Sequence, residues 1–222
     1  MAHYPPSNDF TPQAAPPSPI PALRTATLVL FWLTAAASAA VTVSTFLRRG
    51  AWKDSLAAGT GITDDLTSHD VPVIISVFVL TMVVVTSAVA VAAWSMRLVL
   101  SAQARGVTGV SPGWAAGGWF VPLGFLVLGF RQITKAVNAL GGNGIKIIGW
   151  QIAFASAAIV MSVAQFSSQD VSAIPTDNSI SVFTRECLLS LASTFLFIAS
   201  AALATRAIID ADRTIDAAPL TH

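Results

Sequence analysis

Four long runs of apolar residues dominate the hydrophobic pattern of this chain. They cover about residues 25–47, 71–96, 147–166 and 187–206, and the only charged residue inside these bounds is Arg206 at the end of the last run. A helix of about 20 residues rises about 30 Å, which is the thickness of the hydrocarbon core of a bilayer. A strand in that environment leaves its backbone groups unpaired, so a helix is expected even over the β-branched block at 83–85. The pattern predicts four transmembrane helices.

A fifth apolar segment, at about residues 112–138, is interrupted by residues that break helices. It includes the stretch SPGWAAGGWFVPLGF at 111–125, in which Pro122 removes a backbone donor and four glycines weaken a helix. Three arrangements stay open: a re-entrant segment, a short kinked span and a surface-lying segment. The predicted fold class is an all-α integral membrane protein, a bundle of four long transmembrane helices plus this Pro/Gly-broken segment.

The two ends of the chain differ from the apolar centre. Proline is frequent in residues 1–22, which we predict to be a disordered tail that lacks the early basic region of a signal peptide. Residues 23–213 form the single predicted transmembrane domain, and residues 214–222 form a C-terminal tail. The first run is therefore expected to act as an uncleaved anchor.

The distribution of basic residues restricts the orientation, because Lys and Arg near helix ends favour the cytoplasmic side. If the broken segment does not cross, eight of the 12 Lys and Arg residues lie inside with both termini. If it crosses, a different set of eight lies inside, so the count is tied. The loop at 167–184, with two Asp and no Lys or Arg, favours four spans, whereas an outside Arg48–Arg49 pair argues for five. Both arrangements predict a multi-pass protein of the cell (inner) membrane with a cytoplasmic C-terminus.

Composition supports the membrane class and limits the partners. Hydrophobic residues make up 54% of the chain and charged residues 10%, against about 25% charged in soluble domains. Mean hydropathy is +0.70. A net charge of +1 provides no basic field for nucleic acid. The expected partners are the lipid bilayer and a membrane protein or a second copy of the chain.

The residue types that catalysis and metal binding require are missing from the spans. The three histidines, His3, His69 and His222, lie in a tail or a loop, and no HExxH motif occurs. Serines in the spans have no base in register, so we interpret them as small residues that pack between helices. Arg185 and Glu186, at the mouth of the last span, are expected to pair or face water. We predict no catalytic residue, no cofactor and no metal, and hence no enzyme.

Aromatic and basic residues are the remaining candidates for a site. Five of the six tryptophans are expected toward the inner side, either as ordinary interfacial anchors or as the lining of an aromatic pocket around 111–125. Arg131, Lys135 and Lys146 flank this stretch and are candidate contacts for anionic lipid headgroups.

The region around this stretch carries a resemblance to a known family. A tryptophan and an arginine close the second helix, a Pro-Gly-Trp…Gly-Trp-Phe-x-Pro motif follows, and a tryptophan opens the next helix; the residues are Trp94, Arg97, Pro112, Gly113, Trp114, Gly118, Trp119, Phe120, Pro122 and Trp150. The pattern resembles the actinobacterial multi-pass membrane family called domain of unknown function 4328, over about residues 25–213. Phe125 stands where that family has an asparagine, and Leu128–Gly129 where it has a Pro-Tyr pair. The resemblance implies an architecture and a place for a pocket, not a reaction.

Two functions follow as hypotheses. The first is a non-enzymatic scaffold or accessory subunit of a membrane assembly, because catalytic chemistry is missing and small residues line the helices. The alternative is a passive transporter or a membrane protein that binds a lipid or small molecule beside residues 113–125. Broken backbone at membrane depth is tolerated only inside protein or beside a water-filled cavity.

Overall fold

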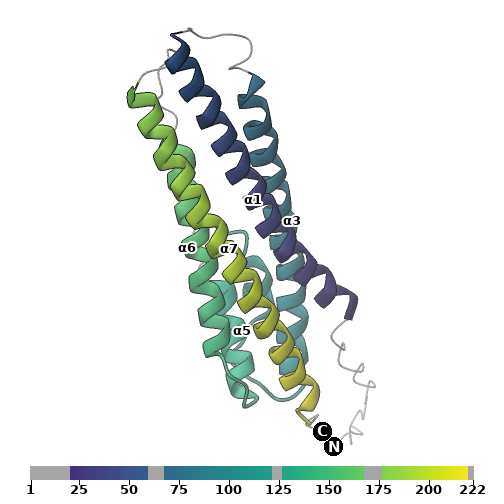
Figure 1. The fold of residues 1–222 in the computed structure, drawn as a ribbon. Helices are drawn as coiled ribbons and strands as arrows, with labels where there is room; N and C mark the ends of the chain where they lie inside the picture. The colour runs from purple at the N-terminus through teal and green to yellow at the C-terminus, as the bar shows by residue number, and fades with distance from the viewer. Residues whose placement is uncertain (1–20, 60–67, 122–126, 168–176, 220–222) are drawn as a thin grey trace, which may run out of the picture.

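Four long helices form the bundle that the apolar runs predict. The computed structural model describes residues 21–59, 68–121, 127–167 and 177–219. Within them lie the helices α1 (Pro21–Ala58), α3 (Asp70–Gln103), α4 (Pro112–Gly117), α5 (Leu128–Ala139), α6 (Ile145–Ser167) and α7 (Asp177–Ala217), shown in Figure 1. Four of these, α1, α3, α6 and α7, are long and apolar enough to cross a membrane. The predicted fold class is confirmed.

The long helices extend well beyond the apolar runs. Helix α1 continues from the run at 25–47 to Ala58, and α7 begins ten residues before its run at 187–206 and ends eleven residues after it. An apolar run measures the thickness of hydrocarbon, whereas a helix continues into water as long as its backbone remains bonded. Residues 21–22 of the predicted tail and 214–217 of the C-terminal tail are therefore helical, and residues 1–20 and 220–222 lie outside the described residues.

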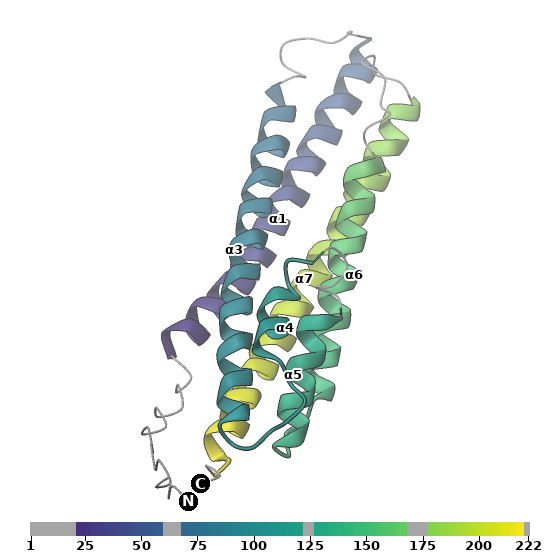
Figure 2. The same cartoon turned by 180° about the vertical axis from the view of Figure 1, so that it is seen from behind.

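The four long helices alternate in direction along the bundle axis. We call the end where α1 begins and α7 ends the proximal end, and the opposite end the distal end. Helix α3 ends and α6 begins at the proximal end, where α4 and α5 also lie (Figure 2). With 6 and 12 residues, these two helices are about 9 and 18 Å long and too short to cross. The described parts of the broken segment therefore lie at the proximal end, and this arrangement favours four spans over five.

Hydroxyl groups join the long helices where small residues let them approach. The hydroxyls of Ser38 and Thr42 on α1 each lie 2.9 Å from the Thr194 hydroxyl of α7, and Thr34 lies 3.2 Å from Ser87 of α3. Ser193 donates to a carbonyl of α6 at 3.0 Å. These buried contacts fit the prediction that serines in the spans pack helices together, because polar groups in hydrocarbon need a partner within the bundle.

A buried ion cluster closes the distal end and corrects one expectation. Glu186 is 5% exposed and pairs with Arg48 of α1, which also lies 3.7 Å from Asp70 and 4.5 Å above the ring of Phe183. The prediction that Glu186 pairs with Arg185 or faces water is therefore wrong, and Arg185 is exposed. Chain neighbours on a helix point in different directions, so only the packing of α1 on α7 selects the partner.

Candidate functional site

An aromatic cluster occupies the proximal half of the bundle. Trp150 of α6 is 0% exposed and contacts the rings of Phe31 at 5.2 Å, Phe130 at 4.9 Å and Trp119 at 6.2 Å between centroids. Trp94 joins from α3, 6.4 Å from Trp150. These three tryptophans are buried within the bundle, not anchors at its surface. The alternative prediction, an aromatic inner site around residues 111–125, describes them better than interfacial anchoring does.

Helix α4 fixes the position of Trp119 through its own sequence. Ser111 caps the helix by accepting a hydrogen bond from the Trp114 amide, and Pro112 occupies its first turn, where a missing N–H has no consequence. Ser95 of α3 donates to the Ala115 carbonyl at 2.7 Å, which ties α4 to α3. Trp119 follows directly after α4 and packs on Phe130 of α5 at 4.8 Å.

Two glycines allow α4 and α5 to approach closely. A Cβ atom on Gly118 would lie 2.7 Å from the backbone nitrogen of Gly129, and one on Gly129 would lie 2.7 Å from Nε1 of Trp119. Both distances are too short for a Cβ atom, so α4 and α5 could not approach this closely with a larger residue at either position. Gly117 has open space at the same point, so only one glycine of the Gly117–Gly118 pair is required by packing.

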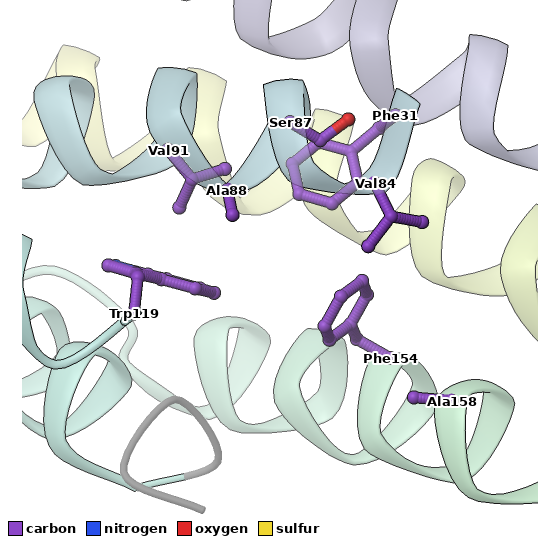
Figure 3. A pocket seen from close by; sticks show the side chains of 8 residues that line it. All are labelled: Phe31, Val84, Ser87, Ala88, Val91, Trp119, Phe154 and Ala158. Carbon is purple, nitrogen blue, oxygen red and sulfur yellow. The ribbon is translucent and has the colours of Figure 1, made fainter. Parts of the chain in front are cut away.

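A groove lies between α3 and α6, which make no substantial contact with each other over their described residues. Next to Trp119 it forms a cavity of about 200 Å³, lined by Phe31, Val84, Ser87, Ala88, Val91, Trp119, Phe154 and Ala158. In Figure 3, Trp119 and Phe154 face Val84, Ala88 and Val91 of α3 across the open space. We call this feature, together with its distal continuation, the α3–α6 groove.

The groove continues toward the distal end as a second cavity of about 350 Å³. Val84, Phe154 and Ala158 line both cavities, and the distal one reaches Val77 on α3 and Phe166 on α6. Val77 and Val91 are fourteen positions apart, which corresponds to about 21 Å along a helix. The groove therefore follows most of the hydrocarbon depth, about 30 Å.

The α3–α6 groove is almost entirely apolar. No charged side chain lines either cavity, and the Ser87 hydroxyl already donates within the protein, to the Val83 carbonyl at 2.7 Å. Such a surface offers mainly dispersion contacts, and its lining contains no Asp, Glu, His or Lys side chain for proton transfer. Its chemistry fits a hydrophobic molecule.

A buried carboxylate lies on the proximal side of the aromatic cluster. Asp212 of α7 is 2% exposed, accepts a hydrogen bond from the Trp94 indole at 3.1 Å and lies 3.8 Å from Arg24. These contacts join α1, α3 and α7 near their proximal ends. Trp94 therefore has two roles: it packs in the aromatic cluster and it donates a hydrogen bond to the buried Asp212 carboxylate. The apolar pattern of the sequence does not predict this buried carboxylate.

The predicted site residues fall into two groups. Packing brings together Trp94, Gly118, Trp119 and Trp150, whereas Trp114, Phe120, Arg97, Arg131 and Lys135 are exposed. Pro112 and Gly113 begin α4, and Pro122 lies outside the described residues. Lys146 pairs with Asp210 of α7, so of the three candidate headgroup contacts only Arg131 and Lys135 have no ion pair with a described residue.

The sequence predictions missed Phe31 and Phe154, which line the groove. Both lie within runs that are apolar throughout, where no pattern separates a groove-lining position from a lipid-facing one. They also missed Asp212, for which the only sequence signal is an acidic residue shortly after the last apolar run.

Candidate metal ligands do not cluster in the described part of the chain. Over residues 21–59, 68–121, 127–167 and 177–219, no three His, Cys, Asp or Glu side chains come together in a way that can hold a metal ion. Cys187 is buried as a free thiol.

No family model, curated protein or solved structure matches this chain. The resemblance to the domain of unknown function 4328 stays a prediction.

Proposed function

We propose that this protein is a non-enzymatic multi-pass membrane protein that binds a hydrophobic molecule, a lipid acyl chain, in the α3–α6 groove. The observation that carries the proposal is the groove itself, a mostly apolar groove between the spans α3 and α6, with Trp119 at its proximal end. The distal cavity, about 350 Å³, is of the size of small-ligand sites, roughly 300–1,000 Å³, and the proximal cavity of about 200 Å³ adjoins it.

The shape and position of the groove support an acyl chain as the occupant. A groove of about 21 Å that runs along the helices matches an extended chain lying parallel to its neighbours in the bilayer. Its walls are membrane spans and it is not enclosed, so a chain can enter sideways from the hydrocarbon. An aqueous solute would meet only a few uncharged polar side chains there, Thr81, Ser87, Ser162 and Gln165. The scaffold role expected from the sequence stays a prediction, and the groove favours binding.

The four-span arrangement also supports an orientation. In this arrangement, the eight basic residues assigned to the inside all belong to the proximal end: Arg24, Arg97, Arg105, Arg131, Lys135, Lys146, Arg206 and Arg213. The other four belong to the distal end. By the positive-inside rule, we propose that the proximal end and both termini face the cytoplasm.

Filling the groove tests the proposal. Ala88 lies on the groove wall, whereas Ala93 is exposed on the same helix, five positions or about 140° away. We expect wild-type protein, purified in mild detergent, to retain lipid in native mass spectrometry. Ala88→Phe loses that lipid and Ala93→Phe keeps it, since both variants add the same volume and only one adds it to the groove. Equal lipid retention by the two variants would refute the proposal.

A further inference from the structure

Charge is distributed very unevenly in the half of the chain that forms the groove. From Val71 to Gln169 the sequence contains no Asp or Glu, but it contains Arg97, Arg105, Arg131, Lys135 and Lys146. All five belong to the proximal end, at the end of α3, on α5 and at the start of α6. The proximal end below the groove therefore carries a local excess of positive charge.

Two of these five cations are engaged within the protein, whereas Arg97 and the two cations of α5 are exposed and have no ion pair with a described residue. Lys146 pairs with Asp210, and Arg105 donates to the carbonyls of Ser101 and Ala218. Arg131 and Lys135 are exposed and form no ion pair with any described residue. They are four positions apart, one helical turn, so they lie on the same face of α5.

Helix α5 begins next to the floor of the groove. Gly129 lies against the Trp119 indole, and Phe130, one residue before Arg131, packs on the same ring at 4.8 Å. Lys135 is six positions beyond Gly129, or about 9 Å farther from the groove. Phe120 directly follows Trp119 and Val127 directly precedes α5, and both are exposed apolar side chains, 59% and 54%.

The depth of these cations matches that of the proximal interface. Arg24 is seven positions before Phe31, and Arg97 is six positions after Val91, so both lie about 9–10 Å proximal to groove-lining residues. Lys135 lies at a similar level beyond Trp119. Charged side chains at equal depth on three helices mark the plane where lipid headgroups are placed.

We propose that the α3–α6 groove holds an anionic phospholipid, with an acyl chain along the groove above Trp119 and the phosphate headgroup on Arg131 and Lys135 of α5. This inference rests on the proposed function and adds the chemical class of the ligand. The groove supplies dispersion contacts for any lipid, and the two cations supply the preference for negative charge. Each cation is expected to contribute about fivefold to the affinity, and both together about 25-fold.

The test compares two lipids that differ only in the headgroup. Wild-type protein is exchanged into an equimolar mixture of dioleoyl phosphatidylglycerol and dioleoyl phosphatidylcholine, and the retained lipids are measured by native mass spectrometry. We expect a preference of about 25-fold for phosphatidylglycerol. The double variant Arg131→Gln/Lys135→Gln is expected to keep a bound lipid and to retain both kinds about equally, which also shows that its groove is intact.

A control removes the same charge at the same end of the bundle. Arg206 and Arg213 of α7 are exposed, nine and sixteen positions from the groove residue Phe197, and so lie about 180° and 160° around the helix from it. Arg206→Gln/Arg213→Gln keeps the preference. The inference is overturned if the α5 variant keeps the preference or if both double variants lose it equally. Wild-type protein that retains both lipids equally, and loses both on Ala88→Phe, overturns the headgroup assignment alone and leaves the proposed function standing.

Discussion

Replacing Gly118 by alanine tests whether α4 and α5 pack as the groove floor requires. The added Cβ would lie 2.7 Å from the Gly129 nitrogen, 2.7 Å from the Trp114 carbonyl oxygen and 2.9 Å from Cβ of Leu128. Carbon atoms in good contact are about 3.5–4.0 Å apart, so the shortfall is about 1 Å. Two of the three atoms belong to the backbone, and no side-chain rotation relieves them.

The expected loss of stability follows from this overlap. The backbone of Gly118 has φ −57° and ψ −23°, which alanine adopts without strain, so packing alone decides the outcome. Overpacking of this kind lowers the free energy of unfolding by about 1–3 kcal/mol. For a chain of this length, about 2 kcal/mol corresponds to a fall in Tm of about 4–8 °C.

Gly117→Ala is the matched control, one residue earlier in the same motif. A Cβ on Gly117 meets nothing within 4 Å, and alanine favours a helix over glycine by about 1 kcal/mol. We expect the Tm of this variant to stay the same or rise in detergent, followed by circular dichroism. Tryptophan emission of Gly118→Ala should shift to the red as Trp119 separates from α5. If the two variants had the same Tm within a degree, α4 and α5 would not be packed at Gly118 and the described floor of the groove would be wrong.

Two further predictions concern the buried charges. Glu186→Gln leaves the Arg48 guanidinium without its closest carboxylate, so we expect the free energy of unfolding to fall by about 2–3 kcal/mol. This is less than the roughly 3–5 kcal/mol for a fully isolated charge, because Asp70 remains 3.7 Å from Arg48. Chemical unfolding should show that the double variant Arg48→Met/Glu186→Leu recovers most of this loss, and an equally unstable double variant would contradict this account. Trp94→Phe removes the hydrogen bond to the buried Asp212 and should lower the free energy of unfolding by about 1.5–3 kcal/mol. In a double-mutant cycle with Asp212→Asn, strictly additive effects would exclude an energetic coupling between Trp94 and Asp212.

Some local features of the structure can be read from polar residues in the sequence. Polar and apolar residues of α5 alternate at helical spacing, so the spacing alone assigns an exposed and a buried face. The polar residues are Arg131, Lys135 and Asn138. The apolar residues, Phe130, Ile133 and Val137, are buried in the bundle. In the motif at 111–125, serine and proline predict where α4 begins. The sequence also indicated that the motif is the most unusual part of the chain, and this is where the groove is closed.

Charge pairing across the bundle was not predictable in the same way. Arg48 and Glu186 are 138 positions apart, and each has closer charged neighbours in the sequence. The apolar run of α1 stops at Leu47, so the sequence assigned Arg48 to a solvated helix end. Packing of α1 against α7 removes that end from water and selects Glu186 as its partner.

The helical, membrane-spanning character of the chain follows from its sequence, because the length of an apolar run and the need to pair every backbone group in hydrocarbon leave no other structure. Which apolar residues face protein, lipid or the groove depends instead on how the helices pack. In a membrane span, both the inner and the outer surface are hydrophobic, so the helical periodicity that marks a buried face in water is absent. Phe31 and Phe154 line the groove while Trp32 and Ile152, close beside them in the sequence, are exposed, and nothing but the packing of four helices distinguishes them.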